Sequence, residues 1–388
     1  MKNSSRIKIV LLAVAALALP AITFAAPGQK AKSPKPLPGR ISFFAGDPYG
    51  EGSELWICSP DGLNKKELVG KEANDDPDGR ADVRSPAVWN STGRRLAWIH
   101  GYDLRSFDLS TGKESVIPLP KTKSQDGPGL LNPSGTPAWD QSGKWILTGG
   151  LISQEADSDG GLWQISVEGK PPRMLFPAVD ADGAMYDNPK LSQNGRYLAA
   201  GSSMDESGVF QVYDWQNQHP LKRGNIPDRI LSYLTDFVLL PNNKSALLSC
   251  NTIFFNEKPG PGGIWKWDIR TGKIRRFLEK GREVNQLELS PDGKLLIYMA
   301  NIVRGVYRLS NLKQICVYNM ATGTSRILVK SIYIDYLDTI SWAPDSRHFV
   351  FSGTPEGGGR HHIWMVDALT EEKKLIIEHG WRPVWSPR

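Results

Sequence analysis

The chain ends with "PVWSPR" at residues 383–388, and these six letters decide the fold. Elsewhere the same apolar anchor and turn open a longer unit, as in "LSPDGKLLIY" (289–298) and "WAPDSRHFVF" (342–351). In those units a second apolar strand follows the turn, whereas none follows Trp385. The stretch "PGRISFFAG" (38–46) has the opposite defect, because it begins with the Gly-Arg that elsewhere follows the turn. Joining the two stretches restores one complete unit.

The pattern of anchor, turn and basic residue occurs seven times. Subtracting the residue numbers of successive anchors gives spacings of 50, 52, 48, 50, 53 and 43 residues. The intervening segments are short apolar runs separated by Gly, Pro, Asn and Asp, which favours antiparallel strands over helical repeats. The seven anchors are Trp89, Trp139, Leu191, Leu239, Leu289, Trp342 and Trp385.

Each unit contains the signals of four strands. After the second strand comes a third, such as "GLWQIS" or "HIWMVD", and a short turn such as "RTGK" (270–273) leads into a fourth. Radially repeated four-stranded units are typical of a β-propeller. We therefore predict an all-β, seven-bladed β-propeller of four-stranded antiparallel blades. Its ring is closed by the C-terminal strand, which pairs beside Ile41–Ala45 in the N-terminal blade.

The stretches "LSPDGK" and "WAPDS", together with the Thr-Gly-Lys turns, resemble the WD-repeat-like propeller units of the TolB family. Similar units occur in the propellers of prolyl-oligopeptidase-like enzymes. The resemblance covers residues 39–388 and implies a propeller that binds proteins of the cell envelope. Two features depart from TolB itself: only a short segment precedes the propeller, and seven blades are expected where TolB has six. No hydrolase domain accompanies the propeller.

The N-terminal region predicts export. Lys2, Arg6 and Lys8 precede an apolar run at 9–19, and small residues follow up to Ala26. This order is typical of a secretory signal, which we place at residues 1–25. The alternative is an uncleaved anchor, for which the apolar run is short. We interpret residues 26–38, rich in Pro and Lys, as a linker, and residues 39–388 as the propeller. The mature chain is then periplasmic or secreted, with no transmembrane span.

The charge balance argues against a nucleic-acid partner. The whole chain has 47 basic and 41 acidic residues. Removing the three basic residues of the signal leaves 44, and removing the three lysines of the linker leaves 41 against 41. A propeller without basic excess lacks the charge that phosphate backbones require. Cys58, Cys250 and Cys316 lie in apolar runs and are expected to be buried free thiols; the alternative is a Cys250–Cys316 disulfide.

The long connections predict where a partner binds. In antiparallel blades the second-to-third loops and the crossings between blades lie at one end, and here these segments are long and irregular. Loops on a rigid scaffold are frequent binding surfaces, although they can also lengthen without function. Aromatic side chains suit a protein partner. We expect the partner-binding residues to be Phe254, Phe255, Arg304, Tyr307, Tyr333, Tyr336, His361 and His362.

One of these loops contains a candidate metal site. In "NDDPDGRAD", residues Asn74, Asp76, Asp78 and Asp82 place oxygen ligands at alternate positions around a turn glycine, as calcium loops do. Asn stands at the first position, and the bidentate Glu expected at the twelfth position is replaced by Ser85. The pattern therefore allows Ca²⁺, the alternative being an acidic, solvated turn. No redox or nucleotide cofactor is expected.

Catalytic signatures are missing from the sequence. There is no Gly-x-Ser-x-Gly elbow, no His-Glu-x-x-His and no phosphate-binding glycine loop. We therefore assign no catalytic residue and predict a non-catalytic binding or scaffold protein whose partner is a protein, with carbohydrate as a second ligand class. The alternative function is a carbohydrate-active enzyme, a polysaccharide lyase or hydrolase, on the same scaffold.

Overall fold

The computed structural model describes residues 37–47, 52–71, 85–124, 127–152, 159–177, 186–204, 207–221, 226–252, 254–255, 258–302, 312–334, 338–354 and 359–388. They belong to one compact unit, Leu37–Arg388. The predicted signal and most of the predicted linker lie outside the described residues and stay predictions. No helix of the described segments is long and apolar enough to cross a membrane.

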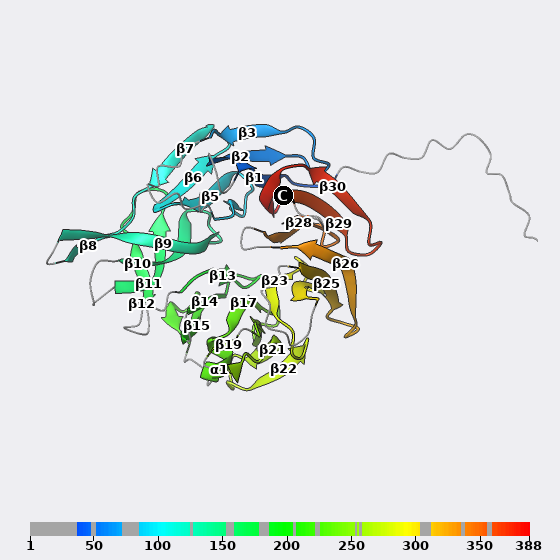
Figure 1. Ribbon diagram of the computed structural model, residues 1–388. Coiled ribbons are helices and arrows are strands. Elements are labelled where there is room, and N and C mark those ends of the chain that lie inside the picture. Colours follow the sequence, from blue (N-terminus) through cyan, green and yellow to red (C-terminus); the bar gives the residue numbers. More distant parts are fainter. Residues whose placement is uncertain are drawn as a thin grey trace, which may run out of the picture. The chain divides into compact units, whose positions relative to one another are not determined.

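The strands described form seven antiparallel blades (Figure 1). From the inside outwards, blade 1 contains β31 (Gly380–Trp385), β1 (Ile41–Asp47), β2 (Gly52–Cys58) and β3 (Lys66–Val69). Blade 2 contains β4 (Val88–Trp89), β5 (Arg95–His100), β6 (Asp103–Asp108) and β7 (Lys113–Ile117). Blade 3 contains β9 (Gly127–Trp139), β10 (Trp145–Ile152), β11 (Asp159–Ser166) and β12 (Arg173–Pro177), with β8 (Lys121–Ser124) paired to β9.

The other four blades follow the same order along the chain. Blade 4 contains β13 (Lys190–Leu191), β14 (Tyr197–Met204), β15 (Ser207–Asp214) and β16 (His219–Pro220). Blade 5 contains β17 (Leu234–Leu239), β18 (Ser245–Cys250), β21 (Gly263–Asp268) and β22 (Ile274–Leu278). Blade 6 contains β23 (Val284–Leu289), β24 (Leu295–Asn301), β25 (Leu312–Asn319) and β26 (Ser325–Tyr333). Blade 7 contains β27 (Ile340–Trp342), β28 (His348–Gly353), β29 (His362–Asp367) and β30 (Lys373–Ile377).

Three short elements lie in the connections. The hairpin of β19 (Phe254–Phe255) and β20 (Lys258–Pro259) joins the second and third strands of blade 5. The helix α1 (Asp228–Leu231) lies in the crossing from blade 4 to blade 5. These additions leave the blades all-β, as the sequence predicts.

In five of the seven blades the turn after the anchor is stabilised by the side chain that follows the anchor. In blade 2 the Oδ1 atom of Asn90 accepts hydrogen bonds from the backbone N–H groups of Arg94 and Arg95, at 3.0 and 3.1 Å. Gly93 takes a φ of 65°, which the turn requires and which other residues adopt only at a cost. Asp140 makes the same two contacts in blade 3. The "anchor, polar, x, Gly, basic" pattern is therefore a hairpin turn with its own cap.

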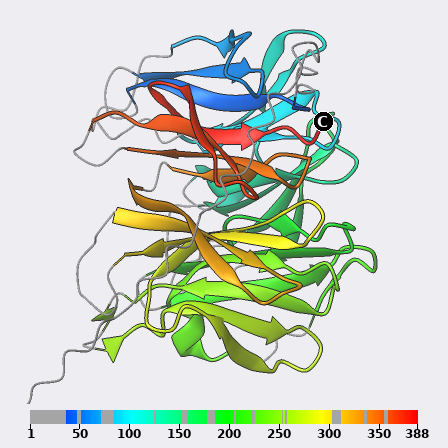
Figure 2. The same cartoon turned by 90° about the vertical axis from the view of Figure 1, so that its right-hand side faces the viewer.

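The ring closes as the sequence predicts. Strand β31 pairs antiparallel with β1, with Ile41 opposite Trp385 and Ala45 opposite Gly380. Figure 2 shows β31, in red, beside β1, in blue. The Ser386 N–H donates to the Arg40 carbonyl at 2.8 Å and its Oγ accepts from the Arg40 N–H at the same distance, across 346 residues of sequence. The tail is thus the inner strand that the N-terminal region lacks.

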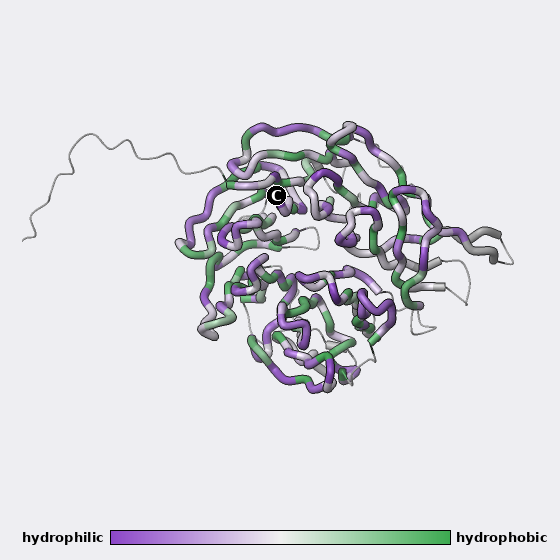
Figure 3. Tube along the Cα trace, turned by 180° about the vertical axis from the view of Figure 1, so that it is seen from behind, coloured by the Kyte–Doolittle hydropathy of each residue, from purple (hydrophilic) through white to green (hydrophobic). Residues whose placement is uncertain are grey.

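The hydrophobic core lies between the faces of neighbouring blades. Ala97 and Ile99 of blade 2 pack with Ile146 and Trp163 of blade 3 in one cluster, and equivalent clusters join the other neighbours. Figure 3 shows apolar segments recurring along the strands, with hydrophilic residues along much of the outer rim. Because each blade covers the next, the buried area grows with every unit, and the ring has to be complete for both faces of blade 1 to be covered.

Anchor tryptophans also link the blades by a repeated hydrogen bond. In three of the four anchor tryptophans the indole Nε1–H donates to the carbonyl of the residue before the anchor of the preceding blade, whereas that of Trp385 donates to the Pro38 carbonyl at 2.9 Å. The three pairs are Trp89 to Val384 (3.1 Å), Trp139 to Val88 (3.0 Å) and Trp342 to Glu288 (3.1 Å). The anchors are therefore both core residues and inter-blade donors.

Replacing Trp139 by Phe is expected to lower the free energy of unfolding by about 1–3 kcal/mol, because the Val88 carbonyl loses a partner in addition to the lost packing. The matched control is Trp98→Phe: Trp98 is buried, and its Nε1 has no hydrogen-bond partner among the described residues. That variant loses ring volume alone. Urea unfolding measures both, and an equal or smaller loss for Trp139→Phe would contradict the proposed role of the bond.

Candidate functional site

The two ends of the blades differ. We call the end that carries the second-to-third loops and the blade crossings the loop face, and the opposite end, with the short turns, the turn face. Inner strands start at the loop face and end at their anchors near the turn face. The first residues of the inner strands therefore surround the mouth of the central channel at the loop face, where residues from different blades can meet.

Several inner strands are irregular at this mouth. The register shifts between Asn285 and Glu288 in blade 6 and between Ser42 and Phe44 in blade 1. Gln286 and Arg382 lie at these bulges with φ values of 52° and 50°, a conformation that non-glycine residues adopt only under constraint. A bulge turns a side chain away from the regular alternation. Both residues occupy the third position before their anchors, so the irregularity repeats with the blades.

A buried ion network joins three consecutive inner strands. The Lys190 Nζ atom of blade 4 lies 2.8 Å from Asp236 Oδ1 of blade 5 and 3.6 Å from Glu288 Oε1 of blade 6. Asp236 also accepts from the backbone N–H groups of Phe237, at 2.7 Å, and Leu287, at 2.8 Å. The Asp236 carboxylate therefore ties two neighbouring inner strands to one ammonium group.

The electrostatics of this network follow from burial and charge. Burial by itself lowers the pKa of Lys190, but the attraction of Asp236 and then of Glu288 outweighs it, and the pKa lies above its ordinary value of 10.5. Burial raises the pKa of Glu288 above 4.5, against the attraction of Lys190. Lys190 is thus charged at neutral pH, whereas burial opposes the ionisation of Glu288.

A second polar group lies between blades 6 and 7. His361 Nδ1 is 3.0 Å from Asp338 Oδ1, whose side chain is fully buried. The Gln286 side-chain amide donates to the Asp338 carbonyl oxygen. The carboxylate fixes the orientation of the imidazole ring, as in many sites where a histidine is held for binding or proton transfer.

A third network lies in blade 6. The Glu283 carboxylate accepts from Lys313 Nζ at 2.9 Å and from the Asn301 side-chain amide at 2.7 Å. Arg282 donates from Nε to the Asn301 carbonyl at 2.9 Å. Lys313 and Arg282 are both nearly buried. In all three networks the carboxylates already bind cations, ring nitrogens or backbone N–H groups, an arrangement that orders the inner strands around the channel.

The structure places three predicted partner-binding residues on neighbouring blades. Tyr333 ends β26 of blade 6 and is 40% exposed. Its backbone N–H and carbonyl bond to those of Thr354 in blade 7, at 3.0 and 2.9 Å. His362 is the first residue of β29 in blade 7, and His361 precedes it. The backbone of Phe254 and Phe255 forms β19 in blade 5. Arg304, Tyr307 and Tyr336 lie outside the described residues, so their role stays a prediction.

An apolar patch surrounds Tyr333. Leu312 is paired with Tyr333 across β25 and β26, and the Ile302 N–H lies 3.4 Å from the Leu312 carbonyl. Ile302 is 36% exposed. Ile302, Leu312 and Tyr333 thus occupy three neighbouring strands at the loop face of blade 6, and we call them the blade 6 patch. Ile302 and Leu312 also flank, in sequence, the segment that contains Arg304 and Tyr307.

A histidine pair lies on the adjoining blade. The rings of His362 and His379 are 5.4 Å apart, and the His379 N–H donates to His362 Nδ1 at 3.3 Å. Burial lowers the pKa of His362, and the neighbouring His379 lowers it further. His362 is therefore neutral at pH 7, because its ordinary value is already 6.5. The neutral His362 ring and its neighbour His379 lie on the blade next to the blade 6 patch.

The predicted calcium ligands Asn74, Asp76, Asp78 and Asp82 lie outside the described residues. Within the segments that the structure describes, no group of three or more His, Cys, Asp or Glu side chains is arranged to hold a metal ion. The calcium site therefore stays a prediction from the sequence.

The three cysteines are free and buried, as predicted, and the alternative Cys250–Cys316 disulfide is absent. Burial raises the pKa of Cys58 and Cys250 to about 12 and that of Cys316 to about 11. None of them has the exposed, low-pKa thiol of a reactive site.

Thiol titration of the native protein is accordingly expected to show no rapid reaction at pH 8, where a pKa near 12 leaves roughly one thiolate in 10⁴. Addition of denaturant should release all three thiols. Ellman's reagent measures both states, and one rapid equivalent in the native protein would contradict this assignment.

The channel-mouth residues were missed in the sequence, apart from His361. A signal for two of them exists in the register of the repeat. The residue before the anchor is Val, Ala or Ser in five blades but Lys190 and Glu288 in blades 4 and 6. Because this repeat position otherwise has small or apolar residues, the two opposite charges predict an ion pair between inner strands at the channel.

Comparison with known proteins supports the fold alone. No protein-family model and no curated protein sequence matches the chain. Among solved structures, TolB from Acinetobacter baumannii is 17% identical with a TM-score of 0.52, covering 90% of this chain and 67% of that one. A periplasmic gluconolactonase from Pseudomonas aeruginosa is 13% identical, with a TM-score of 0.56 and coverage of 89% and 99%.

A prolyl oligopeptidase B from Galerina marginata is 14% identical with a TM-score of 0.55, and the match covers 88% of this chain but only 48% of the oligopeptidase. These similar structures include a TolB and two enzymes, so shared architecture does not select one activity. What the structure and the comparisons establish together is a seven-bladed β-propeller, and the solved structures similar to it include a TolB.

Proposed function

We propose that this protein is an exported, non-catalytic binding protein that contacts a protein of the cell envelope through the loop face of blades 6 and 7. The observation that carries the proposal is the blade 6 patch beside the His362–His379 ring pair. Tyrosine and aliphatic side chains exposed on a rigid rim are the usual anchors of protein interfaces.

The chemistry of the channel mouth supports binding over catalysis. A general acid or base acts through a group that is free to exchange a proton with a substrate. In the described part of the mouth, Asp236 and Glu283 instead accept several hydrogen bonds each. Their role is to hold neighbouring inner strands in place and so to keep the loop face rigid.

Export rests on the order of charged, apolar and small residues at positions 2–26. The likeness to TolB and to a gluconolactonase described as periplasmic agrees with that location. The free cysteines are compatible with an oxidising compartment because all three thiols are buried.

Changing the blade 6 patch is expected to remove partner binding. The double variant Tyr333→Ala with Ile302→Ser should retain less than a tenth of the captured partner, because loss of interface anchors costs about 2 kcal/mol or more. The control is Leu63→Ser with Leu369→Ser, which removes two exposed apolar side chains at the turn face.

The measurement is affinity capture from envelope extract, followed by titration of the recovered protein against all three forms. Equal recovery by the patch variant and the wild type would overturn the proposal. All variants should show unchanged melting, since the exchanged side chains are exposed.

A second candidate function, a carbohydrate-active enzyme, is favoured by one observation, the carboxylate-oriented imidazole of His361. If His361 transfers a proton, His361→Ala should abolish turnover of an acidic oligosaccharide, while His219→Ala, an exposed histidine of blade 4, should not. Absence of turnover by the wild type across acidic oligosaccharides and lactones would remove this candidate.

A further inference from the structure

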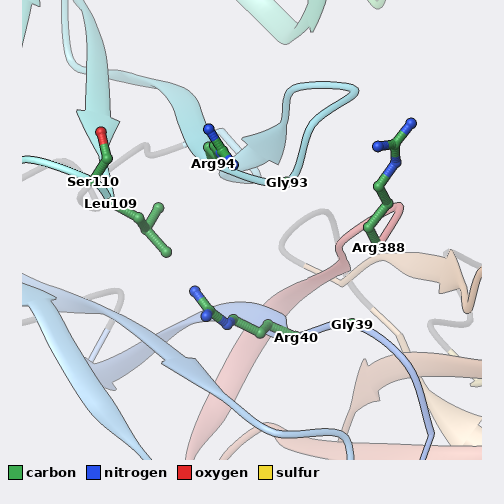
Figure 4. Close-up of a pocket in the computed structure, with 7 residues that line it drawn as sticks. All are labelled: Gly39, Arg40, Gly93, Arg94, Leu109, Ser110 and Arg388. Carbon is green, nitrogen blue, oxygen red and sulfur yellow. The ribbon is translucent and has the colours of Figure 1, made fainter.

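A depression of about 390 Å³ lies at the turn face between blades 1 and 2. Arg40, Arg94 and Arg388 line it together with Leu109 and Ser110, and Figure 4 shows these side chains around the space between the two blades. The three arginines are exposed and come from three separate segments. Within the described part of the chain, none of their guanidinium groups takes part in an ion pair or a hydrogen bond.

The other blades show what such a basic residue normally does. The turn of each unit ends in a basic residue, and in three blades that residue binds an acidic side chain of the same blade. Arg347 Nε donates to Asp367 at 2.9 Å, Arg196 lies 3.7 Å from Asp214, and Lys144 lies 3.3 Å from Glu168. The basic residue is therefore neutralised within its own blade.

Blade 1 lacks the acidic partner. In four blades the residue after the basic one begins the second strand and is paired with an aspartate at the end of the third strand. These pairs are Arg95 with Asp108, Tyr197 with Asp214, Ser245 with Asp268 and His348 with Asp367. In blade 1 the corresponding pair is Ile41 and Cys58. Cys58 is a buried thiol with its pKa raised to about 12, so it gives Arg40 no negative charge.

Blade 2 has the aspartate, Asp108, but two arginines follow its turn. Arg95 binds Asp108 at 2.8 Å, and this leaves the preceding Arg94 without a carboxylate. Arg388 adds a third guanidinium group from the C-terminal turn of blade 1. The seam between the two ends of the chain thus collects three guanidinium groups without an ion pair among the described residues, whereas the basic turn residues of blades 3, 4, 6 and 7 each pair with an acid.

The groove continues past Arg40. A second depression, of about 490 Å³, shares Arg40 and Leu109 with the first and adds Ser59, Asn64 and Lys66. Lys66 is exposed, and no ion pair of Lys66 occurs among the described residues. Four cations therefore follow one continuous surface, with amide and hydroxyl groups beside them.

We propose that this groove binds a ligand carrying at least two phosphate groups. Guanidinium groups bind phosphate in bidentate geometry, and arginine is weakly hydrated compared with lysine, so three of them suit phosphate oxygens. Charges spread along an open groove match an extended polyphosphorylated ligand, either free or as lipid headgroups. This site is separate from the protein-binding loop face and lies at the opposite end of the blades.

The test compares two pairs of substitutions that remove the same charge. Arg40→Gln with Arg94→Gln removes unpaired arginines of the groove, whereas Lys144→Gln with Arg196→Gln removes basic residues at the same repeat position that bind acids. Calorimetry in calcium-free buffer uses inorganic tripolyphosphate as the probe for a free ligand. Flotation with phosphatidylglycerol vesicles, against phosphatidylcholine vesicles, probes a headgroup.

The wild type is expected to bind at least one probe, with a loss of affinity of tenfold or more in the groove variant and less than twofold in the control variant. Binding of tripolyphosphate alone identifies a free phosphorylated ligand, and binding of the anionic vesicles alone identifies headgroups; both outcomes support the site. Binding of neither probe, or equal losses in the two variants, would overturn it. Melting curves of both variants should match the wild type because the exchanged side chains are exposed.

Discussion

A variant that ends at His379 is expected to lose cooperative folding. It lacks β31, the inner strand of blade 1, and with it the buried indoles of Trp381 and Trp385. Trp381 stacks on Phe44 with ring centroids 5.1 Å apart. Removing one buried tryptophan costs about 3–5 kcal/mol, and a domain has only about 5–15 kcal/mol in total. The truncation also leaves the edge of β1 without a partner.

A circular permutant provides the matched control for this truncation. Joining Arg388 directly to Gly39 gives "WSPRGRI", which has the length of the natural turn "LSPDGKL" of blade 6. New ends can be placed in the exposed turn at Thr111 and Gly112. This protein keeps every strand and should melt within a few degrees of the wild type. Circular dichroism and calorimetry measure all three chains, and cooperative melting of the truncated chain near the wild-type temperature would contradict ring closure by β31.

Replacing Asp236 by Ala is expected to lower the free energy of unfolding by about 3–5 kcal/mol, because it leaves the largely buried ammonium of Lys190 without its nearest partner. Two backbone N–H groups lose their acceptor at the same time. The control is Glu168→Ala, which breaks the exposed Lys144–Glu168 pair and should cost less than about 1 kcal/mol. Urea unfolding of the two variants measures the difference, and similar small losses would show that the network does not hold the inner strands.

The same network predicts how stability depends on pH. The pKa of Lys190 is raised on folding, so its stabilisation is fully present below pH 10.5 and is lost as the pH rises through the folded value. Glu288 is also raised, from 4.5, so ionising it opposes folding, and stability falls as the pH rises through the folded value of this carboxyl. In Asp236→Ala the alkaline loss should be smaller than in the wild type. Unfolding at pH 8–11 measures this loss of stability. If the loss is the same in the variant and the wild type, groups other than Lys190 cause it.

The architecture could be predicted because the same repeat marks the anchors, the turns and the strands of the blades. The anchor recurs in every blade, a capping side chain and a turn glycine recur in most of them, and the incomplete tail has one complement in the chain, at Gly39 and Arg40. The hydrogen bonds of Ser386 with Arg40 confirm that match. Periodicity thus fixed the strands, the blade number and the closure.

The channel mouth could not be predicted in the same way because its contacts join different units. Lys190, Asp236 and Glu288 are about 50 residues apart, and only the ring brings them together. The bulges at Gln286 and Arg382 interrupt the strand alternation, so a pattern of period two assigns their side chains to the wrong side. The groove arginines could not be predicted for another reason. Arg40 and Arg94 stand at the turn position that is basic in every blade, and Arg40 differs only because Cys58 replaces the aspartate of other blades.

Closure by β31 also has a consequence for how the polypeptide matures. Ribosomes add roughly 5–20 residues per second, so β1 emerges on the order of 17–70 seconds before the residues that complete its sheet, 346 positions later. Throughout that interval no native state is available to the nascent chain. The edge of β1 therefore stays without its native partner until the final residues are released, which is compatible with the export proposed above.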